Sequence, residues 1–196
     1  MHLLQLIEQK TIVAISIQTS GTDIKRDYIV SVGAVKLAGW VNECAKDDWC
    51  KYDKVNISST FMSFVRCPLT SPQTVRKNIG ISDETLKNAP STDNVLARLK
   101  EFTGSSIILA YNADYVCGFL NECGNRHGIS FDNRRLDVAA IAKSIFRDKV
   151  KNYELSALAN RFGIKYDKKS VVDESYAVAK LLGELALRDD EAHCKY

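Results

Sequence analysis

Two polar side chains interrupt a run of residues that otherwise predicts a buried strand. Ser16 and Gln18 lie at the end of residues 11–18, a stretch rich in β-branched residues, which the following Thr-Ser-Gly terminates. Because alternate residues of a strand face the same side, the two side chains are expected on one face, about 6 to 7 Å apart. Their hydroxyl and amide oxygens can make hydrogen bonds, but neutral oxygens are weak ligands for a hard metal ion.

A third candidate for chemistry is Glu174, within a long helix predicted over 170–187. The helical period puts Val171, Glu174, Val178, Leu181 and Leu185 on one apolar stripe, and Asp173, Ala177, Lys180 and Glu184 on a wetter face. An unpaired carboxylate on an apolar stripe would cost several kcal/mol, so Glu174 needs a partner. Lys169, just before the helix, or failing that another basic group, is the expected partner, with Ser16 and Gln18 supplying hydrogen bonds. The alternative is that Lys169 extends into solvent.

The elements around these residues alternate between strand and helix. Strands are predicted over 11–18, 28–37, 59–65 and 106–111, and helices over 91–102, 113–123, 137–146, 153–162 and 170–187. Asp137 is interpreted as a helix start rather than a catalytic acid. This order predicts an α/β layered fold in which helices cover both faces of a sheet. The polar stretch 42–56 predicts a surface insertion. Trp40 precedes this stretch and Trp49 lies within it.

The composition of the chain further narrows the class of protein to which it can belong. The chain has 196 residues, 45% of them hydrophobic, and a net charge of +3, which suits a single domain, 1–196, with dispersed surface charge. The start of the chain lacks the features of a signal peptide and no apolar run could span a membrane, so we expect a cytoplasmic protein. The six cysteines show no zinc-ligand spacing. Free thiols are expected, with a Cys44–Cys50 bridge as the alternative.

Several segments, in order, resemble one enzyme family. They are residues 14–21, 28–35, 78–84, 89–91, 110–120, 136–138, 153–159 and 173–182. Together they are similar to the DEDDh (DnaQ-like) 3′-to-5′ exonucleases, a family that includes the proofreading subunit of bacterial DNA polymerase III. Residues 16–21 match its Asp-x-Glu-Thr-x-Gly motif, and 111–120 match its His-Asn-Ala-x-Phe-Asp-x-x-Phe-Leu motif. The resemblance implies an RNase H-like sandwich with a mixed five-stranded sheet, its second strand antiparallel, flanked by helices.

The catalytic positions of that family fall on residues that cannot do the same work. They are Ser16, Gln18, Val116, Lys169 and Glu174, and only Glu174 is a carboxylate. Family members use two Mg²⁺ or Mn²⁺ ions, which need several anionic ligands. We therefore expect no metal and no other cofactor here. Thr19 and Asn112 match family residues beside the substrate strand, but each could equally be a turn or cap residue.

The resemblance and the lost carboxylates together predict a catalytically inactive exonuclease-like domain. It would bind a single-stranded nucleic-acid end or a protein partner within a larger assembly, with no membrane contact. One alternative is an active metal-dependent 3′-to-5′ exonuclease with atypical ligands. Another is a purely structural domain of a polymerase or similar complex. The sequence does not indicate an oligomeric state.

Overall fold

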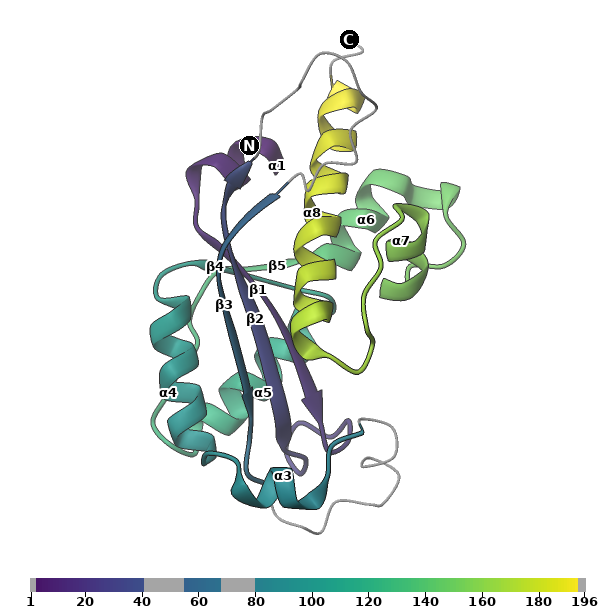
Figure 1. Ribbon diagram of the computed structural model, residues 1–196. Coiled ribbons are helices and arrows are strands. Elements are labelled where there is room, and N and C mark those ends of the chain that lie inside the picture. Colours follow the sequence, from purple (N-terminus) through teal and green to yellow (C-terminus); the bar gives the residue numbers. More distant parts are fainter. Residues whose placement is uncertain (1–2, 41–54, 68–79, 194–196) are drawn as a thin grey trace.

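A five-stranded mixed sheet forms the centre of the computed structural model, which describes residues 3–40, 55–67 and 80–193 (Figure 1). Its strands are β1 (Ile12–Thr19), β2 (Ile29–Trp40), β3 (Val55–Phe64), β4 (Ile107–Ala110) and β5 (Arg135–Asp137). They lie in the order β3-β2-β1-β4-β5, and β2 is antiparallel to both of its neighbours. Strands β1, β4 and β5 are parallel. The expected mixed sheet with an antiparallel second strand is confirmed.

Helices cover both faces of this sheet. They are α1 (Leu3–Gln9), α3 (Asp83–Asn88), α4 (Thr92–Thr103), α5 (Ala113–Asn125), α6 (Val138–Phe146), α7 (Leu155–Arg161) and α8 (Val171–His193), with a short 3-10 turn at Arg147–Lys149. Residues Val13 and Ile15 of β1 pack with α4 and α5, whereas Ile12 and Ala14 pack with α1, α6, α7 and α8. Because side chains alternate along a strand, the even-numbered Ser16 belongs to the α8 face.

The first turn of α8 packs closely on β2. A Cβ atom at Gly33 would lie 2.6 Å from the backbone carbon and oxygen of Val171, so only glycine allows this approach. The buried Ser175 hydroxyl lies 2.9 Å from the carbonyl oxygen of Gly33 and 2.8 Å from that of Val171, and shares its hydrogen between them. Ser16 pairs with Gly33 in the β1–β2 ladder. The start of α8 is thus fixed directly over Ser16.

Some boundaries differ from the sequence expectations. The third strand begins at Val55, so Val55 and Asn56 of the predicted insertion 42–56 belong to β3; the rest of that insertion lies outside the described residues. Ala177, expected on the wetter face of the last helix, is buried, because α8 packs on the sheet and also contacts α1, α6 and α7. Within the described part of the chain, no helix is long and apolar enough to cross a membrane.

Candidate functional site

Gln18, at the end of β1, has both ends of its side-chain amide engaged. Its Nε2 donates a hydrogen bond of 2.9 Å to the backbone carbonyl of Lys169, and its Oε1 accepts one of 2.6 Å from the Ser31 hydroxyl. Ser31 is the direct partner of Gln18 across the β1–β2 ladder. The amide therefore joins two sheet strands to the loop that precedes α8.

Glu174 lies one turn into α8 and is half-buried beside Ser16. Burial raises the pKa of its carboxyl, while a hydrogen bond with the Ser16 hydroxyl acts in the opposite direction and lowers it. Glu174 is thus an inward-facing acid, as the apolar stripe predicted, and its described polar partner is a neutral hydroxyl.

The expected ion pair between Lys169 and Glu174 is absent, and the alternative, a Lys169 side chain that extends into solvent, is the one that the structure has. Lys169 is exposed, and no ion pair joins these two side chains, both of which the structure describes. The reason lies in the loop backbone. The Lys169 N–H donates to the Asp167 carboxylate at 2.8 Å and its carbonyl accepts from Gln18, which leaves the side chain to extend into solvent.

Two hollows divide the five motif positions between them. The first is a cleft of about 230 Å³, lined by Ser16, Ile17, Tyr111, Asn112, Tyr115, Val116 and Glu174. The second, of about 380 Å³, is lined by residues that include Gln18, Ser31, Met62 and Lys169. Tertiary structure therefore brings Ser16, Val116 and Glu174 to one cleft and assigns Gln18 and Lys169 to its neighbour.

Thr19 and Asn112 also lie at this end of the sheet. The Thr19 hydroxyl is 2.7 Å from the Tyr115 hydroxyl and donates to the carbonyl of Gly21, which ties β1 to α5. Asn112 precedes α5 in a left-handed conformation (φ 59°), makes no side-chain capping bond and lines the cleft. Both residues are therefore part of the cleft surroundings, and Thr19 has a clear structural role.

Sequence reasoning singled out neither of the two tyrosines of the cleft wall. Tyr111 and Tyr115 flank Asn112 within the second family motif, and that position was the signal that could have identified them.

Asp137, interpreted as a helix start, does begin α6: its carboxylate accepts from the N–H groups of Ala139 and Ala140. The same carboxylate also accepts from Ala113 at the start of α5, so it joins two helices.

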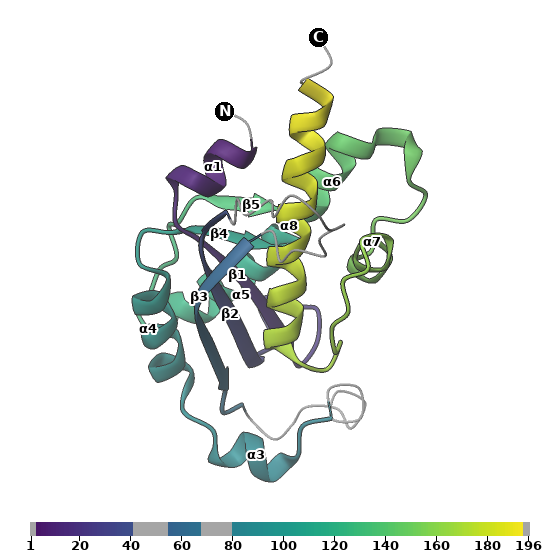
Figure 2. The ribbon, with the colours of Figure 1, turned by 45° about the horizontal axis from the view of Figure 1, so that its top comes forward.

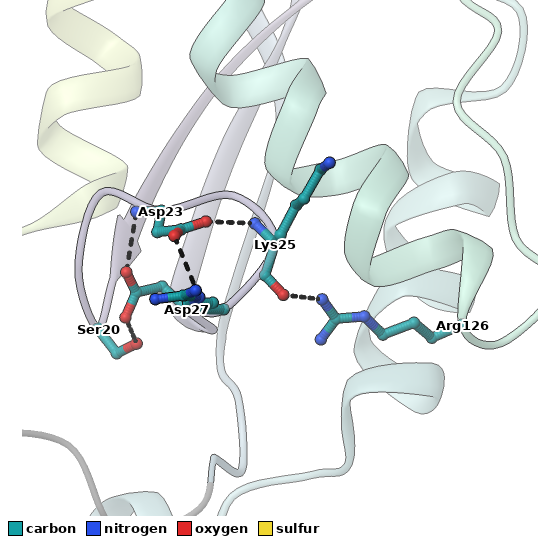
Figure 3. A network of polar contacts seen from close by, with 6 residues as sticks. Ser20, Asp23, Lys25, Asp27 and Arg126 are labelled. Carbon is teal, nitrogen blue, oxygen red and sulfur yellow. Dashed lines mark hydrogen bonds and ion pairs between the residues drawn. The ribbon is translucent and has the colours of Figure 1, made fainter.

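The loop between β1 and β2 is held by a polar network (Figure 3). The Asp27 carboxylate accepts hydrogen bonds from the Ser20 hydroxyl and the Asp23 N–H, both at 2.9 Å. Arg126, the residue after α5, donates to the carbonyl of Lys25 at 2.8 Å. Any side chain at Gly21 would collide with the Asp27 carboxylate. These contacts fix the loop that follows the first motif against α5.

The donor atoms at the cleft do not fit the two-ion centre of the family. Glu174 is the one motif position with a carboxylate, Val116 has no donor atom, and the Gln18 oxygen already accepts from Ser31. Among the described residues, no three His, Cys, Asp or Glu side chains are grouped so that they could hold a metal ion. Besides the Glu174 carboxylate, the lining of this cleft offers hydrogen-bonding groups and apolar surface.

Comparison with known proteins defines the class. A family model described as Exonuclease, of the RNase T type, matches residues 14–179, so the chain belongs to this exonuclease family. This confirms the family resemblance drawn from the ordered motifs.

Individual relatives show which proteins of this kind the chain is similar to. DNA polymerase III PolC-type from Caldanaerobacter subterraneus subsp. tengcongensis is 28% identical over 153 residues, which cover 78% of this chain and 10% of the relative. DNA polymerase III subunit epsilon from Aquifex aeolicus is 24% identical over 156 residues, 79% of this chain and 69% of the relative. The chain spans about a tenth of the length of the PolC-type relatives. It is an exonuclease-like domain related to these polymerase III proteins.

Solved structures agree on the fold. E. coli exonuclease I in complex with a dT13 oligonucleotide superposes with a TM-score of 0.74 at 14% identity, over 95% of this chain and 43% of that chain. The zinc-bound form of its complex with single-stranded DNA gives a TM-score of 0.71 at 16% identity, over 94% of this chain and 43% of that chain.

Proposed function

We propose that this chain is a catalytically inactive exonuclease-like domain that binds a nucleic-acid end or a protein within a larger assembly. The observation that carries the proposal is the Gln18 amide. At the position where the family has a metal-binding Glu, it donates to the Lys169 carbonyl and accepts from Ser31. A residue so engaged holds the loop before α8 in place and has no free anionic oxygen for a dication.

The surroundings support the same proposal. Glu174 is the single carboxylate of the motif set, and two-ion hydrolysis requires several anionic ligands to hold two dications about 3.5 to 4 Å apart. The cleft itself is retained, with two tyrosines on its wall. A retained cleft without hydrolytic ligands suits binding without cleavage.

The relatives suggest what this domain binds. Exonuclease I was solved with single-stranded oligonucleotides, and the epsilon protein is named as a subunit of DNA polymerase III. By analogy, we assign to this domain a single-stranded nucleic-acid end or a protein surface of a replication-type assembly as its partner.

The test is cleavage of 5′-labelled single-stranded DNA and RNA with Mg²⁺ and with Mn²⁺. We expect no product above a no-protein control. Degradation that depends on metal and disappears in Glu174→Ala would contradict the proposal and favour an active enzyme with atypical ligands. Degradation that persists in Glu174→Ala identifies a contaminating nuclease, and the preparation is then purified until it is removed.

A further inference from the structure

Among its described lining residues, the cleft at the ends of β1 and β4 has one carboxylate and no cation. Its walls come from both layers around the sheet, with α8 on one face and α5 on the other (Figures 1 and 2). The carboxylate is that of Glu174, and it forms no ion pair with any residue in the described part of the chain. A carboxylate that folding partly withdraws from water gains from a cation that comes from outside.

The charges that act on the walls of the cleft are negative as well. The pKa of Tyr111 is raised by burial and, further, by the negative charges of Glu154 and Asp137. The pKa of Tyr166 is likewise raised by burial and, further, by the cleft carboxylate. Lys169, from the loop before α8, is exposed and lines the neighbouring hollow instead. The cleft therefore favours a cationic group over a phosphate group.

Two tyrosine rings of the cleft wall are held in fixed positions. The Tyr111 hydroxyl donates to the carbonyl of Tyr153 at 3.3 Å, and the Tyr115 hydroxyl lies 2.7 Å from that of Thr19. The Tyr115 ring also packs on Phe119, with 4.9 Å between the ring centroids. Because both hydroxyls are engaged within the protein, the two residues offer a ligand mainly ring surface. The negative face of an aromatic ring attracts ammonium and guanidinium groups.

We propose that this cleft binds the guanidinium group of an arginine side chain that belongs to a partner protein. The Glu174 carboxylate accepts its N–H groups, and a tyrosine ring contacts its planar face. Asn112, exposed and without a capping bond, offers a further acceptor oxygen from the lining. This inference rests on the proposed function and selects a protein, rather than a nucleic-acid end, as the partner.

A guanidinium group fits this lining better than other cations do. A divalent metal ion needs several anionic ligands, and the lining supplies one carboxylate. An ammonium group is a strongly hydrated point charge, so it loses more when it leaves water. A guanidinium group is weakly hydrated, donates to both carboxylate oxygens and stacks on aromatic rings. The volume of about 230 Å³ suits one side chain and is too small for a folded segment.

The test is an NMR titration that follows the ring resonances of Tyr111 and Tyr115. The probe is N-acetyl-arginine methylamide, in EDTA at about pH 8, where a glutamic acid is ionised even when burial raises its pKa by a few units. N-acetyl-citrulline methylamide, a neutral ligand of the same shape, is the matched control. We expect the arginine probe to bind with a Kd on the order of 1 mM, and the citrulline probe about tenfold more weakly or less well still.

Variants of the cleft separate the two contacts. Glu174→Gln removes the charge and keeps the shape, so it should weaken binding of the arginine probe by about tenfold or more. Asp173→Asn, an exposed acid on the same helical turn, should change it by about twofold or less. Tyr111→Leu should weaken binding and Tyr111→Phe should not, because only the first removes the ring. Circular dichroism checks the fold of each variant, and Glu174→Gln decides the test if Tyr111→Leu does not fold.

Equal affinity for the arginine and citrulline probes, or unchanged affinity in Glu174→Gln, would overturn the inference. So would a thymidine oligonucleotide that shifts the same tyrosine resonances while the arginine probe does not. Free arginine, whose own carboxylate Glu174 repels, should bind more weakly than the capped probe; tighter binding would indicate a small metabolite and contradict a protein partner. Spermidine that binds as tightly as the arginine probe would contradict selection of a guanidinium. Absence of probe binding together with absence of cleavage rejects this inference alone, whereas metal-dependent cleavage rejects the proposed function.

Discussion

The side-chain amide of Gln18 donates a hydrogen bond of 2.9 Å to the backbone carbonyl of Lys169, across 151 positions of sequence. The contact orients the loop before α8 by its backbone and leaves the Lys169 ammonium exposed. Two positions at which the family has catalytic residues therefore meet here through a structural hydrogen bond.

This contact predicts the effect of Gln18→Glu at neutral pH. The carboxylate cannot donate to the Lys169 carbonyl, and two oxygens then face each other, so we expect a loss of about 1 kcal/mol or more in the free energy of unfolding. Urea unfolding measures it. Ser31→Ala, which removes the other partner of the amide and leaves the Lys169 contact intact, should cost less. Equal stability of Gln18→Glu and the parent chain would contradict a structural role for the amide.

Glu174 predicts a pH dependence of stability. Its folded-state pKa is raised mainly by burial, so the folded protein holds this proton more tightly than the unfolded chain. The contribution of Glu174 to the free energy of unfolding is fully present below the ordinary pKa of glutamic acid. It is lost as the pH rises through the raised pKa of the folded state. Glu174→Gln should therefore be the more stable protein at pH 7, and the difference should shrink toward pH 4.

Urea titrations at several pH values test this difference. Asp173→Asn, which removes an exposed acid from the same helical turn, is the control for the change in net charge. A Glu174→Gln profile parallel to that of the parent chain would show that Glu174 does not titrate abnormally. Ser16→Ala should enlarge the loss of stability at neutral pH, because it removes the hydrogen bond that lowers the pKa of Glu174.

The close contact at Gly33 predicts that a larger side chain at this position destabilises the protein. A methyl group there would meet the Val171 backbone at 2.6 Å, and backbone cannot move aside cheaply, so we expect Gly33→Ala to cost about 2 to 3 kcal/mol. Gly128→Ala is the comparison: Gly128 has φ 70° and open space around it, so only backbone strain of about 1 to 2 kcal/mol applies. Thermal and urea unfolding measure both. A smaller loss at Gly33 than at Gly128 would show that α8 can shift.

Restored carboxylates predict restored metal affinity. Ser16→Asp, Gln18→Glu and Val116→Asp, made together, would add three anionic groups to Glu174. We expect Mn²⁺ to raise the melting temperature of this triple variant by about 5 °C or more at saturating metal, by mass action. The parent chain should shift by about 1 °C or less under the same conditions. An equal shift in the parent chain would reveal a metal site that its residues do not suggest.

The insertion predicted over 42–56 has a test of its own. Its residues up to Lys54 lie outside the described part of the chain, and their polar, charged composition offers little apolar surface to bury. Limited trypsin digestion should therefore cut first at Lys46, Lys51 or Lys54. Mass spectrometry of the earliest fragments identifies the site. Resistance across this stretch while Lys165 or Lys168 is cut would contradict an exposed insertion.

The sequence alone determined the main elements, because their signals are local. The β-branched run of β1, the continuous apolar run of β2 and the apolar stripe of α8 each follow from a short-range period, and the stripe correctly placed Glu174 inward. The resemblance carried by the ordered motifs implied a mixed five-stranded sheet with an antiparallel second strand, but not the order of the strands. Short elements had weaker signals: α1 and the three-residue β5 were not predicted, since a few residues show no measurable period.

Tertiary structure alone decided which polar atoms meet. The periods that located Gln18 and Lys169 on their elements contain no information about which of their atoms face each other. Lys169 was expected to neutralise Glu174, yet its carbonyl binds Gln18 and its ammonium extends into solvent. Such pairings depend on the close approach of α8 to Gly33 and on the Asp167 turn, contacts that form only when distant segments pack. Hydrogen bonds act over about 3 Å, so the partner of a side chain is set by the packed fold and not by its position in the sequence.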